Sequence, residues 1–555
     1  MYNVKTLHTP HSTLVPGQSA LFLKYINHDA AALRFYSYAA TLESLDKAAS
    51  EIASQPFPRN EMADILRRQN KSFGADCEVF RSIEALEKPG SVAIVTGQQT
   101  GLFIGPLYTI YKALSAVCLS SELKRRGVNA VPVFWMEADD HDFPEATRRA
   151  VFDAAGQVQT IDFGPKLFQE AEIAMRSVGL LRFADNIQNV TKEYLANIPG
   201  SNWKAGVAEM LETAYASGSS FAEAFAVLMH RLLPETGLIL FNPGDAEVKR
   251  LTSPIYSRAV SCARQIRAAL IRRNEDLSTA GFHAQAQAFH DSTVLFLTFD
   301  EKRQALKQRD DGNFQLKNNC EKIDAAQMLE LAARTPEIFS PNVLLRPIVQ
   351  DYLFPTVAYV GGAAEIAYFA QAEVLYSIFG RPMPVIWPRC GFTLIEPEIA
   401  DAMDKMGIEF KDLFLEKPAL DEKILRRSTS FQSVEKLDHL YEKLDASLTE
   451  IRSDAGKIEA RLDYMTEAAR RKILHNVRHL KSRAIRYETE RDEAIVRDIN
   501  MVMNAIRPGG NLQERELTIF HFLAAHGPDI LKTLRSAIDI ENFSHRLIFL
   551  PCCPC

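Results

Sequence analysis

The sequence predicts an α/β protein in which insertions interrupt a doubly wound parallel sheet, followed by a C-terminal α-helical coiled-coil domain. Residues 92–96 and 130–136 are short apolar runs typical of buried strands, and residues 106–126 between them have the pattern of a helix. Strand, helix and parallel strand make a βαβ unit with a right-handed crossover. A similar pattern returns in residues 356–387. Within residues 434–465, apolar side chains recur at alternating steps of three and four, as in a coiled coil.

Length and charge narrow the class of protein. The chain has 555 residues and a formal net charge of −6, from 64 basic and 70 acidic side chains. Single cores stop growing at roughly 250–300 residues, so we expect several domains or large insertions. The mixed charge lacks the basic footprint of a nucleic-acid-binding protein. No apolar run has membrane-spanning length and no secretory signal is visible, so we expect a cytoplasmic protein.

The cysteines agree with a reducing compartment. Five of the eight are scattered singly, as reduced thiols are in a cytosol. The other three, Cys552, Cys553 and Cys555, form a CCPC tail. A metal site there is the less favoured hypothesis, because metal ligands need fixed geometry.

The segments between the strands predict further elements and the boundaries of the domains. Further elements are expected as helices in residues 29–52 (capped by Asp29), 60–73 and 363–379, as strands in 237–241 and 384–387, and as antiparallel pairs in 151–163 and 293–317. The expected domains are residues 1–145 (first half of the core), 146–235 (insertion 1), 236–270 (core), 271–335 (insertion 2), 336–400 (second half of the core) and 401–555 (helical coiled-coil domain).

The heptad pattern leaves two arrangements open. Its register shifts after residue 469, and no Pro or Gly lies between residues 457 and 507. One long helix fits, and so does an antiparallel hairpin bent near the shift. Either arrangement can form a homodimer through the coiled coil, and a hairpin within a single chain is the alternative.

A glycine-rich loop follows the first strand of the βαβ unit. Glycines let the backbone approach a ligand, and a helix N-terminus offers free N–H groups to an anion. The residues expected to bind substrate here are Gln98, Gln99, Thr100, Gly101, Gly105 and Tyr108. Lys112 shares a helix face with Tyr108 and is a candidate catalytic cation. The alternatives are a tight turn that needs glycine for backbone reasons and a solvated surface lysine.

An acidic cluster follows the second strand of that unit. Residues 137–142 contain four carboxylates and one histidine, at the sheet edge where ligands bind in α/β folds. Like charges this close raise some carboxyl pKa values unless a cation neutralises them. His141, Asp139 and Asp142 are therefore candidate catalytic residues, and Glu137 is a candidate substrate-binding residue. An acidic turn that only caps a helix is the alternative.

The second half of the sheet repeats this arrangement of polar groups. Arg346 and Gln350 precede a strand, Gly361 and Gly362 open a helix that carries Glu365 and Tyr368, and Arg389 follows the next strand. Core packing does not explain so many charged side chains at strand ends. We expect all seven to bind substrate.

Several long motifs together resemble one family. They are TGQQTGLFIGPLYTIYK, PVFWMEADDHDF, GLILFNPGDAEVKRL, SPNVLLRPIVQDYLFPTVAYVGGAAEIAYFAQ and NLQERE, which run in order over nearly the whole chain. The sequence is similar to the cysteine-adding family of bacillithiol biosynthesis, BshC. This resemblance implies a Rossmann-like core with connective insertions, a coiled coil that mediates dimerisation, and a ligase that adds cysteine to glucosaminyl-malate by forming an amide.

The glycine loop also has a placement similar to the HxGH segment of class I aminoacyl-tRNA synthetases, which leads into a helix beside an adenylate. This chain has no histidine in the loop and no KMSKS-like lysine loop. We expect a nucleotide (ATP) as co-substrate, while the activated group remains open: the cysteine carboxylate, the malyl carboxylate or another. The metal requirement is also open.

These features support a ligase as the preferred hypothesis, with cysteine and glucosaminyl-malate as small-molecule partners. Gln98, Gln99 and the following loop would hold an acyl or phosphate group. His141, with Asp139 or Asp142, would orient or deprotonate the incoming amine. The alternatives are a nucleotidyltransferase-like enzyme that activates another small molecule and a non-catalytic coiled-coil scaffold.

Overall fold

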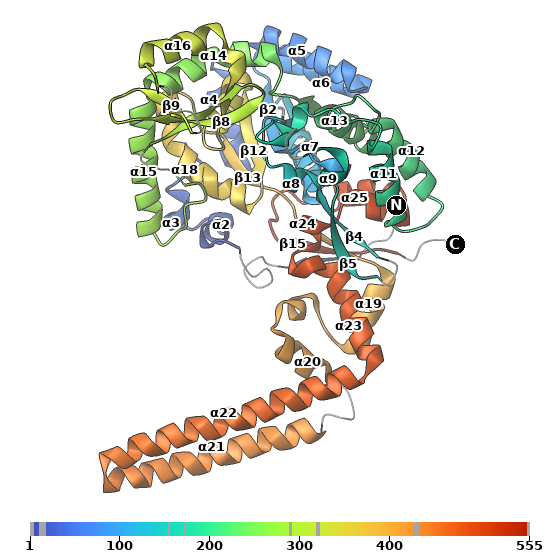
Figure 1. Ribbon diagram of the computed structural model, residues 1–555, viewed down its shortest axis with the longest axis vertical. Coiled ribbons are helices and arrows are strands. Elements are labelled where there is room, and N and C mark those ends of the chain that lie inside the picture. Colours follow the sequence, from blue (N-terminus) through green and yellow to red (C-terminus); the bar gives the residue numbers. More distant parts are fainter. Residues whose placement is uncertain are drawn as a thin grey trace.

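The computed structural model describes residues 5–9, 18–153, 156–169, 173–287, 291–317, 322–425 and 432–551. A five-stranded sheet lies at the centre of the larger part of the molecule, and a long helical hairpin extends away from it (Figure 1). Cys320 and the CCPC tail lie outside the described residues, so the structure does not bear on the tail's metal site. Among the described helices, none has the length and apolar character needed to cross a membrane.

All neighbouring strands of the central sheet are parallel. In spatial order they are β13 (Val385–Pro388), β12 (Thr356–Gly361), β2 (Val92–Gln99), β3 (Ala130–Glu137) and β6 (Ile239–Phe241). The chain builds outward from β2 through β3 to β6 on one side, and from β12 to β13 on the other. The switch point of the topology therefore lies between β2 and β12, where ligands bind in open α/β sheets. The predicted parallel α/β core is confirmed.

Each face of the sheet supports a separate hydrophobic core. Successive strand residues point to opposite faces, so Trp135 packs in one core and Phe134 in the other. The core that contains Trp135 is built from α2 (Ala20–Ile26), α4 (Leu42–Ala53), α5 (Arg59–Ser72), α6 (Cys77–Glu87), α14 (Ala246–Ser261), α15 (Ala263–Thr279), α17 (Arg346–Leu353) and α18 (Ala363–Phe379). The opposite core includes α7 (Tyr108–Arg125), α11 (Ile187–Ala196), α12 (Lys204–Ala214) and α13 (Phe221–Leu232).

The helix expected in residues 29–52 is wrong as one element. Asp29 does act as an N-cap, accepting a hydrogen bond from the Ala31 amide at 2.8 Å, but its helix α3 covers only Ala30–Leu33. The chain becomes extended again at Thr41, whose hydroxyl caps α4 by accepting from the Ser44 amide at 3.2 Å. A second cap thus starts a second helix inside the apolar pattern.

Both expected antiparallel segments are present. β4 (Arg148–Phe152) pairs with β5 (Val158–Asp162), after the short helix α8 (Phe143–Thr147) and before α9 (Gly164–Leu167). The second antiparallel sheet has five strands: β7 (Ser292–Phe299), β8 (Lys302–Gln308), β9 (Phe314–Leu316), β10 (Lys322–Ile323) and β11 (Phe339–Pro341), with α16 (Ala325–Arg334) before β11. This second sheet brings residues of β8 to the carboxyl edge of the central sheet.

The C-terminal part contains its own small sheet. β14 (Phe392–Ile395) and β1 (Lys5–Thr9) flank β15 (His545–Phe549). The helices of this part are α19 (Pro397–Met406), α20 (Lys417–Leu425), α21 (Gln432–Ile458), α22 (Ala460–Arg491), α23 (Glu493–Ile506), α24 (Gln513–Glu516), α25 (Ile519–His526) and α26 (Asp529–Ser536).

The coiled coil is an antiparallel hairpin of α21 and α22 (Figure 1). The chain turns at Glu459, which has an extended conformation, so the bend expected near residue 469 is placed too late. Ion pairs join the two helices, with Arg452 bound to Asp463 at 2.7 Å and Arg470 bound to Asp445 at 2.5 Å. Of the two arrangements that the heptads allowed, the single long helix is wrong.

Candidate active site

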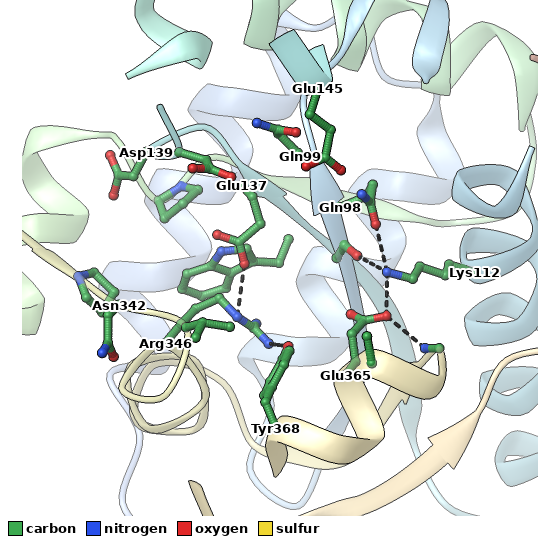
Figure 2. A pocket seen from close by; sticks show the side chains of 18 of the residues that line it. Gln98, Gln99, Lys112, Glu137, Asp139, Glu145, Asn342, Arg346, Glu365 and Tyr368 are labelled. Atoms are coloured by element: carbon green, nitrogen blue, oxygen red, sulfur yellow. Dashed lines mark hydrogen bonds and ion pairs between the residues drawn. The ribbon is translucent and has the colours of Figure 1, made fainter. Parts of the chain in front are cut away.

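A cavity of about 600 Å³ opens at the carboxyl ends of β2, β3 and β12, beside the switch point of the sheet. Figure 2 shows that side chains from both halves of the sheet point toward it. Twelve of the residues selected from the sequence line this cavity: Gln98, Gln99, Tyr108, Lys112, Glu137, Asp139, His141, Arg346, Gly362, Glu365, Tyr368 and Arg389.

Lys112 is buried and uses all three of its donors. Its Nζ lies 2.9 Å from the Gly97 carbonyl oxygen, 2.8 Å from Gln98 Oε1 and 2.5 Å from Glu365 Oε2. Burial lowers the pKa of Lys112, and the ion pair with Glu365 opposes that shift. The alternative of a solvated surface lysine is therefore wrong. Lys112 joins the end of β2 to the start of α18.

Glu365 closes the N-terminus of α18. Its Oε2 accepts from the Gly362 amide at 2.7 Å, and its Oε1 accepts from the Tyr359 hydroxyl at 2.5 Å. Burial by itself would raise the pKa of Glu365, but Lys112 and the Gly362 amide hold it below its usual value. This carboxylate is charged and fully engaged within the protein.

Glu137, which is half-buried, and the buried Arg346 form a second ion pair on the cavity wall (Figure 2). Arg346 Nε lies 2.9 Å from Glu137 Oε1, and its other nitrogens donate to Gln350 Oε1 at 2.9 Å and to the Tyr368 hydroxyl at 2.7 Å. Burial raises the pKa of Glu137 to about 7, with Asp139 and Asp140 adding to the rise and Arg346 opposing it. Gln350 is buried, is not among the lining residues and is bound to Arg346.

The rest of the acidic cluster is divided among separate partners. Asp139 pairs with Lys249 of α14. Asp142 caps α8 by accepting from the Glu145 amide at 3.1 Å. His141 Nδ1 lies 3.1 Å from Arg303 Nη1, and burial together with Arg303 lowers the pKa of His141.

An arginine can only donate, so His141 accepts at Nδ1 and carries its proton on Nε2. The expected pairing of His141 with Asp139 or Asp142 is replaced by a contact with Arg303 of β8.

The glycines of the loop after β2 serve packing within the protein. A Cβ on Gly101 would lie 2.1 Å from Arg149 Nη2, and Gly105 has φ +74°. The buried Arg149 donates through Nε to the Leu102 carbonyl at 2.7 Å, which fixes the loop. Thr100 is fully buried in the same segment. The structure thus places Thr100, Gly101 and Gly105 behind the cavity wall, as the backbone alternative for this loop requires.

Two further candidate residues, Asp142 and Gly361, have structural roles. Asp142 is engaged as the cap of α8, and Gly361 lies where a Cβ would come within 3.0 Å of Glu365 Cβ.

The glutamines of the loop do contact the site: Gln98 Nε2 donates to the Tyr108 hydroxyl at 3.2 Å, and Gln99 Nε2 donates to the Asp142 carbonyl at 3.0 Å.

Arg389 connects the site to the C-terminal part of the chain. Its guanidinium binds Glu514 of α24 in a bidentate manner, at 2.6 and 3.0 Å, and both side chains are buried. Burial alone would raise the pKa of Glu514, but Arg389 lowers it to about 2. The next residue, Arg515, is exposed and lines the cavity. The C-terminal domain therefore contributes directly to this wall.

Two models of one protein family match this chain, one over each part of the fold. The family model "Bacillithiol biosynthesis BshC, N-terminal Rossmann-like domain" matches residues 3–390, and "Bacillithiol biosynthesis BshC, C-terminal coiled-coil domain" matches residues 392–550. The chain belongs to the BshC family. The family resemblance and the fold expected from the sequence are both confirmed.

Curated BshC relatives match over nearly their whole length. Three of them are each named "Putative cysteine ligase BshC". The relative from Salinibacter ruber is 33% identical over 90% of both chains. That from Koribacter versatilis is 34% identical over 94% of this chain and 96% of its own. That from Chlorobaculum tepidum is 34% identical over 90% of both.

Several lining residues of this BshC chain were not selected from the sequence. They include Arg303, Asn342, Tyr359 and Arg515. Arg303 comes from a hairpin far from β3 in sequence, and no local pattern marks it. Arg515 lies in the NLQERE motif, which carried the family resemblance and was the available signal.

A metal site is not evident in the part of the BshC chain that the structure describes. There, no group of three or more His, Cys, Asp or Glu side chains is arranged to hold a metal ion. The acidic residues after β3 have protein partners instead, including Lys249 for Asp139.

Proposed function

We propose that this chain is a cysteine ligase, which joins L-cysteine to the amine of glucosaminyl-malate through an amide bond in bacillithiol biosynthesis. The observation that carries the proposal is the cavity at the switch point, lined by side chains of the same motifs that place the chain in the BshC family. Its volume of about 600 Å³ is within the usual range of small-molecule sites. We place the reaction in the cytoplasm, where the cysteine substrate remains a thiol.

Amide formation requires an activated carboxyl group, an unprotonated amine and a group that accepts a proton. We propose that a nucleoside triphosphate activates the cysteine carboxylate. One edge of the cavity offers backbone groups to a phosphate, where Ala363 and Ala364 line it in the first turn of α18, beside the Gly362 amide that Glu365 engages. Arg515 adds an exposed cation on the same cavity, and its side chain has no ion-pair partner among the described residues.

The positive charges of the buried cations are not available to bind an anionic substrate. Lys112, Arg346 and Arg389 are each neutralised by a carboxylate of the protein. We propose that they fix the shape of the site, and that Lys112 acts through Gln98 and Glu365 rather than on substrate. His141 presents Nε2–H to orient an oxygen of the substrate. Asp139 and Asp142 position neighbouring elements through Lys249 and α8.

Thiol profiling by mass spectrometry tests the function. A strain that lacks only this gene should accumulate glucosaminyl-malate and lose bacillithiol, and the wild-type gene should restore it. Purified protein with cysteine, glucosaminyl-malate and ATP should form bacillithiol. Normal bacillithiol in the deletion strain would contradict the proposal. Nucleotide turnover that does not depend on cysteine would instead favour the nucleotidyltransferase alternative.

We also propose that the chain is a homodimer through the α21–α22 hairpin. The hairpin carries most of the exposed large apolar side chains of the described chain, among them Leu440, Ile451, Ile458, Tyr464, Met465, Ile473, Leu480 and Tyr487. A concentration of exposed apolar side chains on one element is typical of an interaction site. Light scattering after gel filtration should give twice the chain mass, and a Leu480→Glu, Tyr487→Glu variant should give the mass of one chain. A dimeric variant would contradict this interface.

A further inference from the structure

The carboxylates around the cavity differ in the partners that hold them. Both oxygens of Glu365 are engaged, Asp139 is paired with Lys249, and Asp142 caps α8. Asp140 Oδ1 accepts from the backbone amides of His141 and Asp142 at 2.7 and 3.3 Å. Asp139, Asp140 and Asp142 each engage one oxygen, and all four of these carboxylates hold neighbouring parts of the protein together. Glu145, which also lines the cavity, is exposed.

Glu137 is bound instead to an arginine that lines the cavity. Only its Oε1 has a partner, Arg346 Nε at 2.9 Å, and its Oε2 has no hydrogen-bond partner among the described residues. The side chain is 29% exposed and lines the cavity, with its carboxylate above Arg346 in Figure 2. Arg346 is itself locked by Gln350 and Tyr368. Glu137 is therefore a rigidly held carboxylate with one oxygen available to a ligand.

His141 is less suited to accept a proton. Its Nδ1 already accepts from Arg303, whose guanidinium is fixed by Ser340 Oγ at 2.9 Å and by the Pro341 carbonyl at 2.9 Å. A neutral imidazole with an acceptor at Nδ1 carries hydrogen at Nε2, so Nε2 can only donate. A second protonation would place an imidazolium against Arg303.

We infer that Glu137 is the general base of the ligation step and that it takes the proton of the attacking amine on Oε2. This inference rests on the proposed function. The amine nitrogen forms a bond to the activated carboxyl carbon of cysteine. The bond between that carbon and the oxygen of the phosphate-type leaving group breaks, and the leaving group departs with the bonding electrons. The N–H proton moves to Glu137, which releases it to solvent.

The electrostatic surroundings suit this role. The pKa of Glu137 is raised to about 7, mainly by burial; Asp140 and Asp139 contribute to the rise, and Arg346 and Arg303 oppose it. A general base works best when its pKa lies near the working pH, because it is then unprotonated and still basic. An ordinary glutamate, with a pKa near 4.3, would be a much weaker base.

The test separates activation of cysteine from ligation. In the purified full-length protein, Glu137→Gln keeps the shape of the side chain and an oxygen for Arg346. We expect it to retain cysteine-dependent ATP cleavage within about twofold and to lose bacillithiol formation by 10²–10⁴-fold, the usual contribution of a general base. In the wild type, the ligation rate should rise with pH through about 7, and in the residual activity of Glu137→Gln this rise should be absent.

Three controls make the result specific. Glu137→Asp keeps a carboxylate and should retain part of the ligation activity, and equal melting temperatures show that the variants fold. Glu145→Gln changes an exposed carboxylate on the same cavity, so a larger defect there than in Glu137→Gln would overturn the inference. Glu209→Gln, on the exposed surface of α12, should behave as wild type.

The outcomes distinguish this inference from the proposed function. If Glu137→Gln ligates within threefold of the wild type, the inference fails and the function stands. If that variant loses activation and ligation equally, Glu137 has only a structural role and the inference also fails. If wild-type protein shows neither cysteine-dependent ATP cleavage nor bacillithiol formation, the proposed function fails with it.

Discussion

Gly101 shows how one missing side chain supports the site. A Cβ at this position would lie 2.1 Å from Arg149 Nη2, and Arg149 is buried with its donors bound to backbone carbonyls. Gly101→Ala should therefore lower the free energy of unfolding by about 1–3 kcal/mol, as overpacking does. Urea denaturation measures this change. Gly206→Ala, with open space around its Cβ, should be neutral or stabilising; a stable Gly101→Ala would show that Arg149 moves freely.

At the level of single residues, sequence patterns predicted the place of the site more successfully than the role of each residue in it. Polar side chains at the ends of two strands indicated Gln98 and Glu137, because a parallel sheet brings those ends together, and Arg346 stood out as a charged residue in an apolar segment before a strand. The glycines suggested ligand binding, whereas Gly101 accommodates Arg149, nearly fifty residues later. Arg303 reaches His141 from a hairpin in the second insertion. Such contacts depend on tertiary packing, which no local pattern contains.

Among the elements, α7 and α18 are linked by the buried pair of Lys112 and Glu365. Lys112→Met removes one charge and leaves Glu365 buried without its partner, which typically costs about 3–5 kcal/mol. The double variant Lys112→Met, Glu365→Gln should recover much of this loss. A double-mutant cycle from denaturant unfolding measures the coupling. Additive effects of the two substitutions would show that the pair does not hold the helices together.

In the coiled coil, the periodic pattern predicts the helices but not the position of the turn between them. The heptads predicted helices with an apolar seam, and α21 and α22 confirm them. The place of the bend was misassigned because the shift in register after residue 469 lies inside α22. Gly456 lies three residues before the turn, but a Cβ there would be in ordinary van der Waals contact, 3.6 Å from Asp463 Cβ, so the turn does not require glycine at this position.

For the whole molecule, the important connection joins the central sheet to the C-terminal domain. Arg389 follows β13 and Glu514 belongs to α24, and their bidentate contact is buried. Gln513, the residue before Glu514, donates to the Leu394 carbonyl at 2.9 Å and accepts from the Leu394 amide at 2.8 Å. These contacts hold the turn that presents Arg515 to the cavity. The C-terminal domain is thus part of the site as well as a candidate dimerisation module.

This connection should make stability depend on pH in a defined window. The pKa of Glu514 falls from 4.5 to about 2 on folding, because Arg389 outweighs the effect of burial. A lowered pKa stabilises the folded state above the unfolded value, so this contribution is complete above about pH 4.5 and is lost as the pH falls toward 2. The shift corresponds to a contribution on the order of 3 kcal/mol.

Glu514→Gln removes the titrating group and keeps its shape. Its free energy of unfolding should be lower than that of the wild type at pH 7, and the difference should shrink between pH 4.5 and pH 2. Urea unfolding across that range measures both curves. Lys532→Ala, on the exposed surface of α26, is the control and should follow the wild type at every pH. A constant difference between the Glu514→Gln and wild-type curves would mean that Glu514 does not titrate with folding, and that shape rather than charge joins the C-terminal domain to the site.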